Sequence, residues 1–83
     1  MNKLQELVKG LTFNQMFQII EDYERFLEAG SIGDCLLRSQ AEILMGDLGT
    51  KEHVTFWMMD IATECYKHFA KKYLENIKES END

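Results

Sequence analysis

Large apolar side chains recur every three or four positions along most of this chain, which is the spacing of one face of an α-helix. The pattern is clearest over residues 13–29, and residues 2–9 carry a shorter version of it. No segment combines strict apolar–polar alternation with many β-branched residues, and there is no proline. The sequence therefore predicts an all-α fold.

Residues 2–9 are predicted to form a short first helix. Asn2 is a suitable N-cap because its side-chain oxygen accepts a hydrogen bond from the first turn, and Gly10 ends the apolar pattern. Two turns of helix are not stable alone in water, so this segment must pack against the other helices.

A capping box is predicted at the start of the second helix. Thr12 and Gln15 stand three positions apart, so that each side chain can accept from the backbone N–H of the other residue. The amphipathic pattern then continues to about Ala29, and Gly30 suits a left-handed C-terminal turn.

A third helix is expected to begin with Ser31 or Asp34 as its cap. Gly46 and Gly49 interrupt its apolar pattern, so residues 46–49 are predicted to form a turn. The second and third helices together would make an amphipathic hairpin.

The longest predicted helix runs from Thr50, its expected cap, to Glu79. Residues 56–59 are four consecutive large apolar residues. Successive side chains on a helix are about 100° apart, so these four point in all directions. This end of the helix must therefore be enclosed, by its own chain or by another.

Two apolar stripes follow the long helix. One keeps the alternating spacing of three and four that is typical of a coiled-coil seam, and its members are Phe56, Met59, Thr63, Tyr66, Ala70, Tyr73 and Ile77. The other consists of Val54, Met58, Ile61, Cys65 and Phe69. Two interpretations remain open: a single wide core face, or a core stripe beside a stripe that meets a second copy.

Because the predicted turns are short, the hairpin helices and the long helix are expected to pack as successive near-antiparallel neighbours. The predicted fold is a small helical bundle with a short N-terminal helix, an amphipathic helical hairpin and a long C-terminal helix. Residues 1–79 would form a single helical domain, and residues 80–83 a polar, frayed tail.

The apolar composition of this small chain favours self-association. A chain of 83 residues buries only about 60–65% of the surface that its unfolded form exposes. Yet 45% of its residues are apolar and 11% are aromatic, which is more apolar bulk than a short helical core hides. A homodimer or higher assembly would supply the missing cover.

The formal net charge of −6 argues against a domain that binds duplex nucleic acid, because phosphate contacts need a basic surface. The N-terminus lacks the apolar run of a signal peptide, and no stretch approaches the ~20 apolar residues of a membrane span. We therefore expect a soluble, cytoplasmic protein in which Cys35 and Cys65 are reduced thiols.

Candidate chemistry is sparse. Four residues are of types that bind metal ions: Cys35, His53, Cys65 and His68. Only Cys65 and His68 are close together in the sequence, whereas structural zinc sites usually contain two such pairs. Glu64 and His68 are one turn apart, a spacing that is also common on ordinary helix surfaces. No catalytic motif or glycine-rich phosphate loop is present. The sequence predicts no enzyme, no metal site and no cofactor.

The sequence favours a non-enzymatic protein–protein interaction module, acting as a small adaptor, regulator or inhibitor of a larger partner. Its predicted interface with itself or with that partner consists of Phe56, Trp57, Met59, Tyr66, Tyr73 and Ile77. A predicted acidic face, which would steer binding, consists of Glu21, Asp22, Glu24 and Glu28.

Two alternatives accompany this prediction. The first is an oligomer that binds or sequesters an anionic small molecule such as a nucleotide, with Lys67, His68 and Lys71 as the anion site. The second is an inhibitor of a nucleic-acid-binding protein, whose carboxylates imitate phosphates. Binding that is steered by charge weakens with ionic strength, whereas an apolar interface hardly responds.

Overall fold

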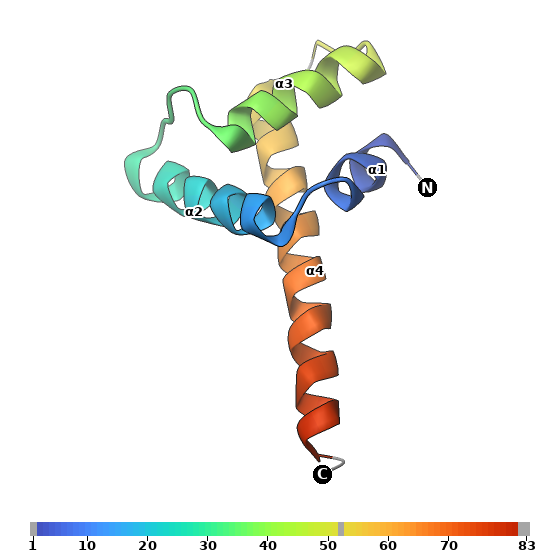
Figure 1. Ribbon diagram of the computed structural model, residues 1–83. Coiled ribbons are helices and arrows are strands. Elements are labelled where there is room, and N and C mark those ends of the chain that lie inside the picture. The colour runs from blue at the N-terminus through green and yellow to red at the C-terminus, as the bar shows by residue number, and fades with distance from the viewer. Residues whose placement is uncertain (1, 52, 82–83) are drawn as a thin grey trace.

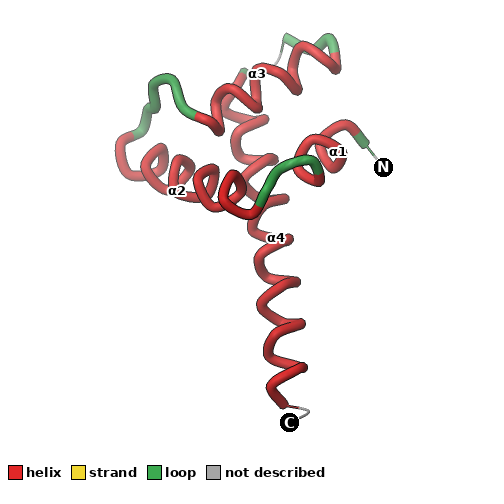
Figure 2. Tube along the Cα trace, in the orientation of Figure 1, coloured by secondary structure: helices red, strands yellow, loops and turns green. Residues whose placement is uncertain are grey.

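Four helices make up the fold, and the all-α prediction is confirmed (Figure 1, Figure 2). The computed structural model describes residues 2–51 and 53–81, with side chains described up to residue 71. The helices are α1 (Lys3–Lys9), α2 (Phe13–Ala29), α3 (Leu36–Leu48) and α4 (Val54–Glu81). No strand occurs in these described ranges.

The first two helices begin and end where local sequence signals predict. In α2 the Gln15 N–H donates to the Thr12 Oγ1 at 3.1 Å, and the Thr12 N–H donates to the Gln15 Oε1 at 2.8 Å. Asn2 makes a second capping box at the start of α1. Gly30 closes α2 with φ of 76°, a left-handed conformation that glycine adopts without steric cost.

The predicted boundaries of α3 are wrong at both ends. Its N-cap is Cys35 rather than Ser31 or Asp34, because the Cys35 Sγ accepts from the Arg38 N–H at 3.4 Å. At the other end α3 continues through Gly46 and stops at Gly49, which has φ of 67°. A glycine inside a helix costs only about 1 kcal/mol, and the burial of the preceding turns outweighs that.

The long helix starts at Val54, four residues later than predicted. Thr50 does not cap it; instead the Nδ1 of His53 accepts from the Thr55 N–H at 3.1 Å. The physical reason is the left-handed end of α3 at Gly49, after which the chain needs several residues to turn back. Glu52, the expected first-turn carboxylate, lies outside the described residues.

One core lies where the other three helices meet the N-terminal half of α4. Its fully or almost fully buried members are Val8, Met16, Ile19, Ile20, Leu37, Ala41, Leu44, Met58, Ile61 and Cys65. α1 contributes Val8, so the prediction that this short helix packs against the others is confirmed.

The long helix α4 crosses α2 and α3 rather than running antiparallel to them, contrary to the prediction. In Figure 1, α2 and α3 lie across the N-terminal half of α4. Helices that run alongside one another would appear parallel from any direction, so one view suffices. Inclined crossings are the commonest way for side-chain ridges of one helix to fit the grooves of another. Because the buried stripe of α4 is short, a crossing already covers it.

The C-terminal half of α4 extends beyond the other three helices (Figure 1). The molecule is accordingly elongated, with a longest extent of 50 Å and a radius of gyration of 14.2 Å. A compact chain of this length would have a radius of about 12 Å. About half of the longest helix therefore projects past the core that stabilises the rest.

Candidate functional site

The N-terminal half of α4 has two apolar stripes, and the structure separates them. Met58, Ile61 and Cys65 are buried in the protein's own core. Phe56 and Tyr66, by contrast, are 63% and 42% exposed. The two stripes therefore do not form a single wide core face. The structure has a core stripe beside an exposed one, which is the arrangement that the second interpretation requires.

We call the uncovered stripe the α4 seam and define it as Phe56, Met59, Thr63, Tyr66 and Ala70. All five of these residues are exposed. In its centre, the Thr63 hydroxyl donates to the Met59 carbonyl oxygen at 2.8 Å, so this polar group already has a partner within α4. The side chains of Tyr73 and Ile77, which continue the spacing, lie outside the described ones.

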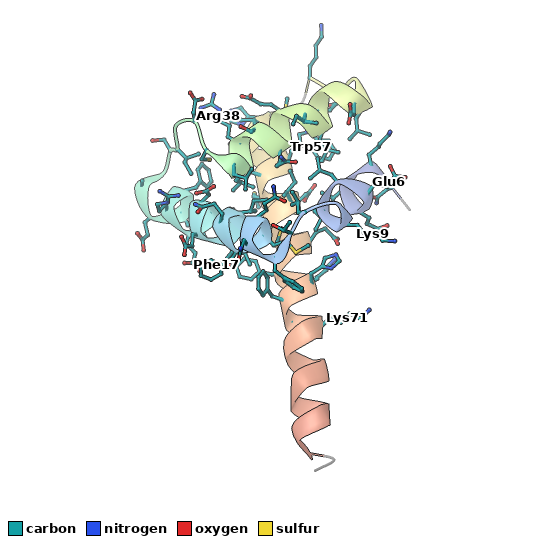
Figure 3. All side chains as sticks on the ribbon, viewed as in Figure 1. Glu6, Lys9, Phe17, Arg38, Trp57 and Lys71 are labelled. Carbon is teal, nitrogen blue, oxygen red and sulfur yellow. The ribbon has the colours of Figure 1, made fainter. Side chains whose placement is uncertain are left out.

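Trp57, which was predicted to be an interface residue, does not lie on the exposed stripe. It is half-buried and packs against the core cluster (Figure 3). Its indole Nε1 is buried and makes no hydrogen bond to the described residues. The reason is the turn of about 100° per residue, which carries Trp57 away from its neighbour Phe56 and toward the other helices.

One edge of the α4 seam continues onto α2. The Tyr66 hydroxyl donates to a carboxylate oxygen of Glu24 at 3.3 Å. One turn further along α4, the ring of Phe69 meets Phe13 and Phe17 edge to face, with centroids 5.5 and 6.5 Å apart. Slight burial and the negative charge of Glu24 raise the pKa of Tyr66.

Phe13 and Phe17 were not predicted to belong to this surface, although they are 49% and 54% exposed. Figure 3 shows Phe17 at the N-terminal part of α2, where that helix passes α4. The sequence signal was the unusual width of the apolar face of α2, which exceeds what a single core contact needs. The aromatic surface therefore spans two helices.

The predicted acidic face loses one member. Glu21, Glu24 and Glu28 are exposed with a spacing of three and four, but Asp22 is completely buried. Asp22 lies about 100° around the helix from Glu21, which places it on the side that faces α3. Glu24 joins this acidic face to the α4 seam through its hydrogen bond with Tyr66.

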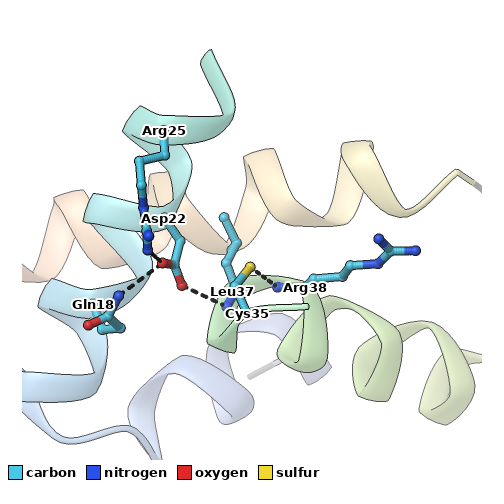
Figure 4. A network of polar contacts seen from close by, with 6 residues as sticks. All are labelled: Gln18, Asp22, Arg25, Cys35, Leu37 and Arg38. Atoms are coloured by element: carbon cyan, nitrogen blue, oxygen red, sulfur yellow. Dashed lines mark hydrogen bonds and ion pairs between the residues drawn. The ribbon is translucent and has the colours of Figure 1, made fainter. Parts of the chain in front are cut away.

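Asp22 instead caps α3 from outside that helix (Figure 4). Its Oδ2 accepts from the Leu37 N–H at 3.3 Å, and its Oδ1 accepts from the Gln18 Nε2 at 2.9 Å and pairs with Arg25. Leu37 is in the first turn of α3, whose N–H groups have no partner within the helix. Spacing was the missed signal, because Asp22 falls in register with the buried Ile19.

The predicted anion site is not a free cluster of cations. Lys67 forms an ion pair with Glu64 at 3.3 Å, and His68 is half-buried. Lys71 is exposed and projects from α4 (Figure 3). An anion approaching Lys67 would also meet the Glu64 carboxylate, which weakens its attraction.

Thiol and metal chemistry find little support in the described residues. Burial, and secondarily the charge of Glu64, raise the pKa of Cys65 to about 11. Its thiolate, which metal binding and nucleophilic attack both require, is therefore disfavoured at neutral pH. Within the described part of the chain, no three His, Cys, Asp or Glu side chains are grouped so that they could hold a metal ion.

A shallow cavity of about 230 Å³ lies between the end of α2 and the beginnings of α3 and α4. Its lining is Phe26, Gly30, Ser31, Ile32, Arg38, His53, Val54, Thr55 and Met58. Arg38 is already engaged there, since its Nη1 donates to the Ile32 carbonyl at 3.2 Å and its Nε pairs with Glu42. The volume is below the ~300–1,000 Å³ of typical ligand sites.

Comparison with protein-family models, curated proteins and solved structures finds no match to this chain. Among the described residues, no helix combines the length and the apolar content that crossing a membrane requires.

Proposed function

We propose that this protein is a non-enzymatic interaction module that associates with itself through the α4 seam and presents its outer faces to a larger partner. The observation that carries this proposal is the regular spacing of an exposed apolar stripe on α4, beside the stripe that forms the protein's own core. Of the surfaces described above, this one has the periodicity of a helix–helix contact.

The exposed apolar area of the α4 seam favours association. Phe56, Met59 and Tyr66 are each 42–63% exposed along one helix face. Covering a large apolar side chain stabilises by about 1–2 kcal/mol when part of it is still exposed, so three such side chains from each copy supply a useful driving force. Burial of the α4 seam against another surface is therefore favourable.

A second copy is the occupant that best fits the spacing. A stripe that repeats every 3.5 residues stays in contact with a partner helix only if that helix has the same repeat. The chain's own α4 supplies it. The projecting half of α4 also gives a second copy room to lie alongside (Figure 1), and an isolated helix of that length is marginal in water.

The acidic face is the part of the molecule that we assign to the larger partner. Glu21, Glu24 and Glu28 are exposed on α2, and a row of carboxylates attracts a basic surface and accelerates encounter. Since Glu24 contacts Tyr66, this face borders the α4 seam, and self-association would set the spacing between two such faces.

Molar mass by light scattering after gel filtration, over a wide concentration range, tests the self-association. The wild-type protein is expected at a multiple of 9.7 kDa, and Phe56→Glu at the monomer mass with an unchanged helical spectrum. Ile43→Glu is the matched control, because Ile43 is similarly exposed, at 53%, but lies on α3. A wild-type monomer at every concentration would overturn the proposal.

A further inference from the structure

We propose that two copies pair their α4 seams antiparallel, about a two-fold axis that passes between Thr63 and Tyr66. This inference rests on the self-association proposed above and adds the orientation and register of the partner helix. It is carried by two charged residues, Asp60 and Lys67, which flank the seam on one edge.

Asp60 and Lys67 are seven residues apart, so they occupy the same position in successive heptads. Both are exposed. Lys67 is paired within its own helix to Glu64 at 3.3 Å, and no ion pair of Asp60 is present among the described residues. This edge thus carries one negative and one positive charge in a row.

On the opposite edge of the seam, the residues of α4 itself are uncharged, which argues against a parallel pair. Its heptad positions hold Thr55, Ala62 and Phe69, and α2 packs along it through the contacts of Phe69 with Phe13 and Phe17. In a parallel pair, the charged edge of each helix would face the uncharged edge of the other. No complementary charges of the two α4 helices would then meet.

In an antiparallel pair, like edges meet, and the two charges complement each other. We place Thr63 level with Tyr66 of the second copy. Asp60 and Lys67 of the second copy are then separated by about two residues, or about 3 Å, along the helix axis. The two-fold axis generates the same contact a second time. Two symmetric ion pairs therefore form, and each copy supplies Asp60 to one of them and Lys67 to the other.

The same charges disfavour the neighbouring registers. A slip of one heptad in one direction brings Asp60 closest to Asp60 of the second copy, and a slip in the other direction brings Lys67 closest to Lys67. Like charges in such positions destabilise a helix pair and select against the wrong arrangement. One antiparallel register is consequently preferred.

Side-chain size agrees with this register. Thr63 would lie level with Tyr66, and Met59 level with Ala70, so the central layers between residues 59 and 70 each combine a large with a small side chain. Parallel pairing would instead set Tyr66 against Tyr66 and Ala70 against Ala70, which alternates crowding with voids. Interiors pack best where large and small residues interdigitate.

Charge reversal provides the test. The single variants Asp60→Lys and Lys67→Asp each replace both intermolecular attractions with repulsions, and should raise the dissociation constant of the dimer roughly tenfold. The double variant, with both reversals, restores complementary pairs and should return the constant to within about threefold of the wild-type value. Sedimentation equilibrium of the full chain measures all four proteins.

The outcomes distinguish failure of the self-association from failure of the antiparallel register alone. A wild-type protein that stays monomeric overturns the self-association and this inference together. A wild-type dimer that the single reversals leave unchanged, or that the double reversal fails to restore, overturns only the antiparallel register. In high salt, near 1 M, the Debye length falls to about 3 Å, and the four constants should converge.

Helix stability must be controlled separately, because Lys67→Asp also removes the ion pair with Glu64 within the helix. Asp60 and Glu64 are like charges one turn apart, so Asp60→Lys removes a repulsion within the helix. Weaker association by this variant would therefore not reflect a weakened monomer. Thermal unfolding at a concentration where all four proteins are monomeric checks that their folds are equally stable.

Discussion

The two apolar stripes of α4 lie side by side on one helix, yet they differ in what covers them and in the side chains that they use. The core stripe, with Met58, Ile61 and Cys65, is buried by the other three helices. The α4 seam contains Thr63 and Tyr66, whose polar groups remain satisfied while exposed. Residues with an apolar body and a polar tip tolerate water until a partner arrives. One helix can therefore stabilise the fold through one stripe while the other stripe, the proposed contact surface, stays exposed.

Truncating one residue from each stripe tests whether the two stripes differ in their contribution to the stability of the monomer. Ile61→Ala should lower the free energy of unfolding of the monomer by about 2–4 kcal/mol, because it leaves a cavity in the core. Phe56→Ala should change it by less than about 0.5 kcal/mol, since Phe56 is 63% exposed. Urea unfolding at low protein concentration measures both. Equal losses would mean that the seam also belongs to the core.

The second prediction compares a buried and an exposed carboxylate at neighbouring positions of α2. Asp22→Ala should lower the free energy of unfolding by about 2–3 kcal/mol, because the Leu37 N–H loses its acceptor and Arg25 its buried partner. Glu21→Ala, one position away but exposed, is the matched control and should have almost no effect. Asp22→Asn, which keeps an acceptor oxygen without the charge, should fall between the two. A neutral Asp22→Ala would contradict the capping role.

The third and smallest effect concerns pH and Cys65 in the core stripe. Its pKa of about 11, against 9.0 for an ordinary thiol, means that between these values the folded state holds a proton that the unfolded chain has lost. Stability present below pH 9 should therefore decline toward pH 11, by about 1–2 kcal/mol. Tyr66, whose pKa is also raised, contributes with the same sign. Cys65→Ala should flatten most of the decline in urea unfolding across this pH range, and an unchanged slope would assign it to Tyr66.

The elements that could be predicted from sequence are those whose signals are local. The start of α2 depends on Thr12 and Gln15, which lie three residues apart, and its end depends on the left-handed Gly30. Both were identified because capping acts within one turn of helix. The alternating spacing of the α4 seam was readable for the same reason, since it depends on position along one helix alone.

The elements that could not be predicted depend on contacts between distant parts of the chain. Cys35 replaced Asp34 as the cap of α3 in a turn that also receives the Asp22 carboxylate, fifteen residues before Leu37. Trp57 was assigned to the interface because four consecutive apolar residues do not reveal which one faces the core. Crossing of the helices likewise depends on how surfaces fit, which a short loop does not determine.

The carboxylate of Asp22 also has a consequence for the order in which the chain folds. The α3 amide at Leu37 gains its acceptor only when α2 is already helical and lies against it. Starting a helix is the unfavourable step, because several residues must be fixed before hydrogen bonds compensate. The formation of α2 therefore lowers the barrier for α3, and the two helices should gain protection from hydrogen exchange together rather than one by one. We therefore expect the Asp22 carboxylate to couple the folding of these two helices.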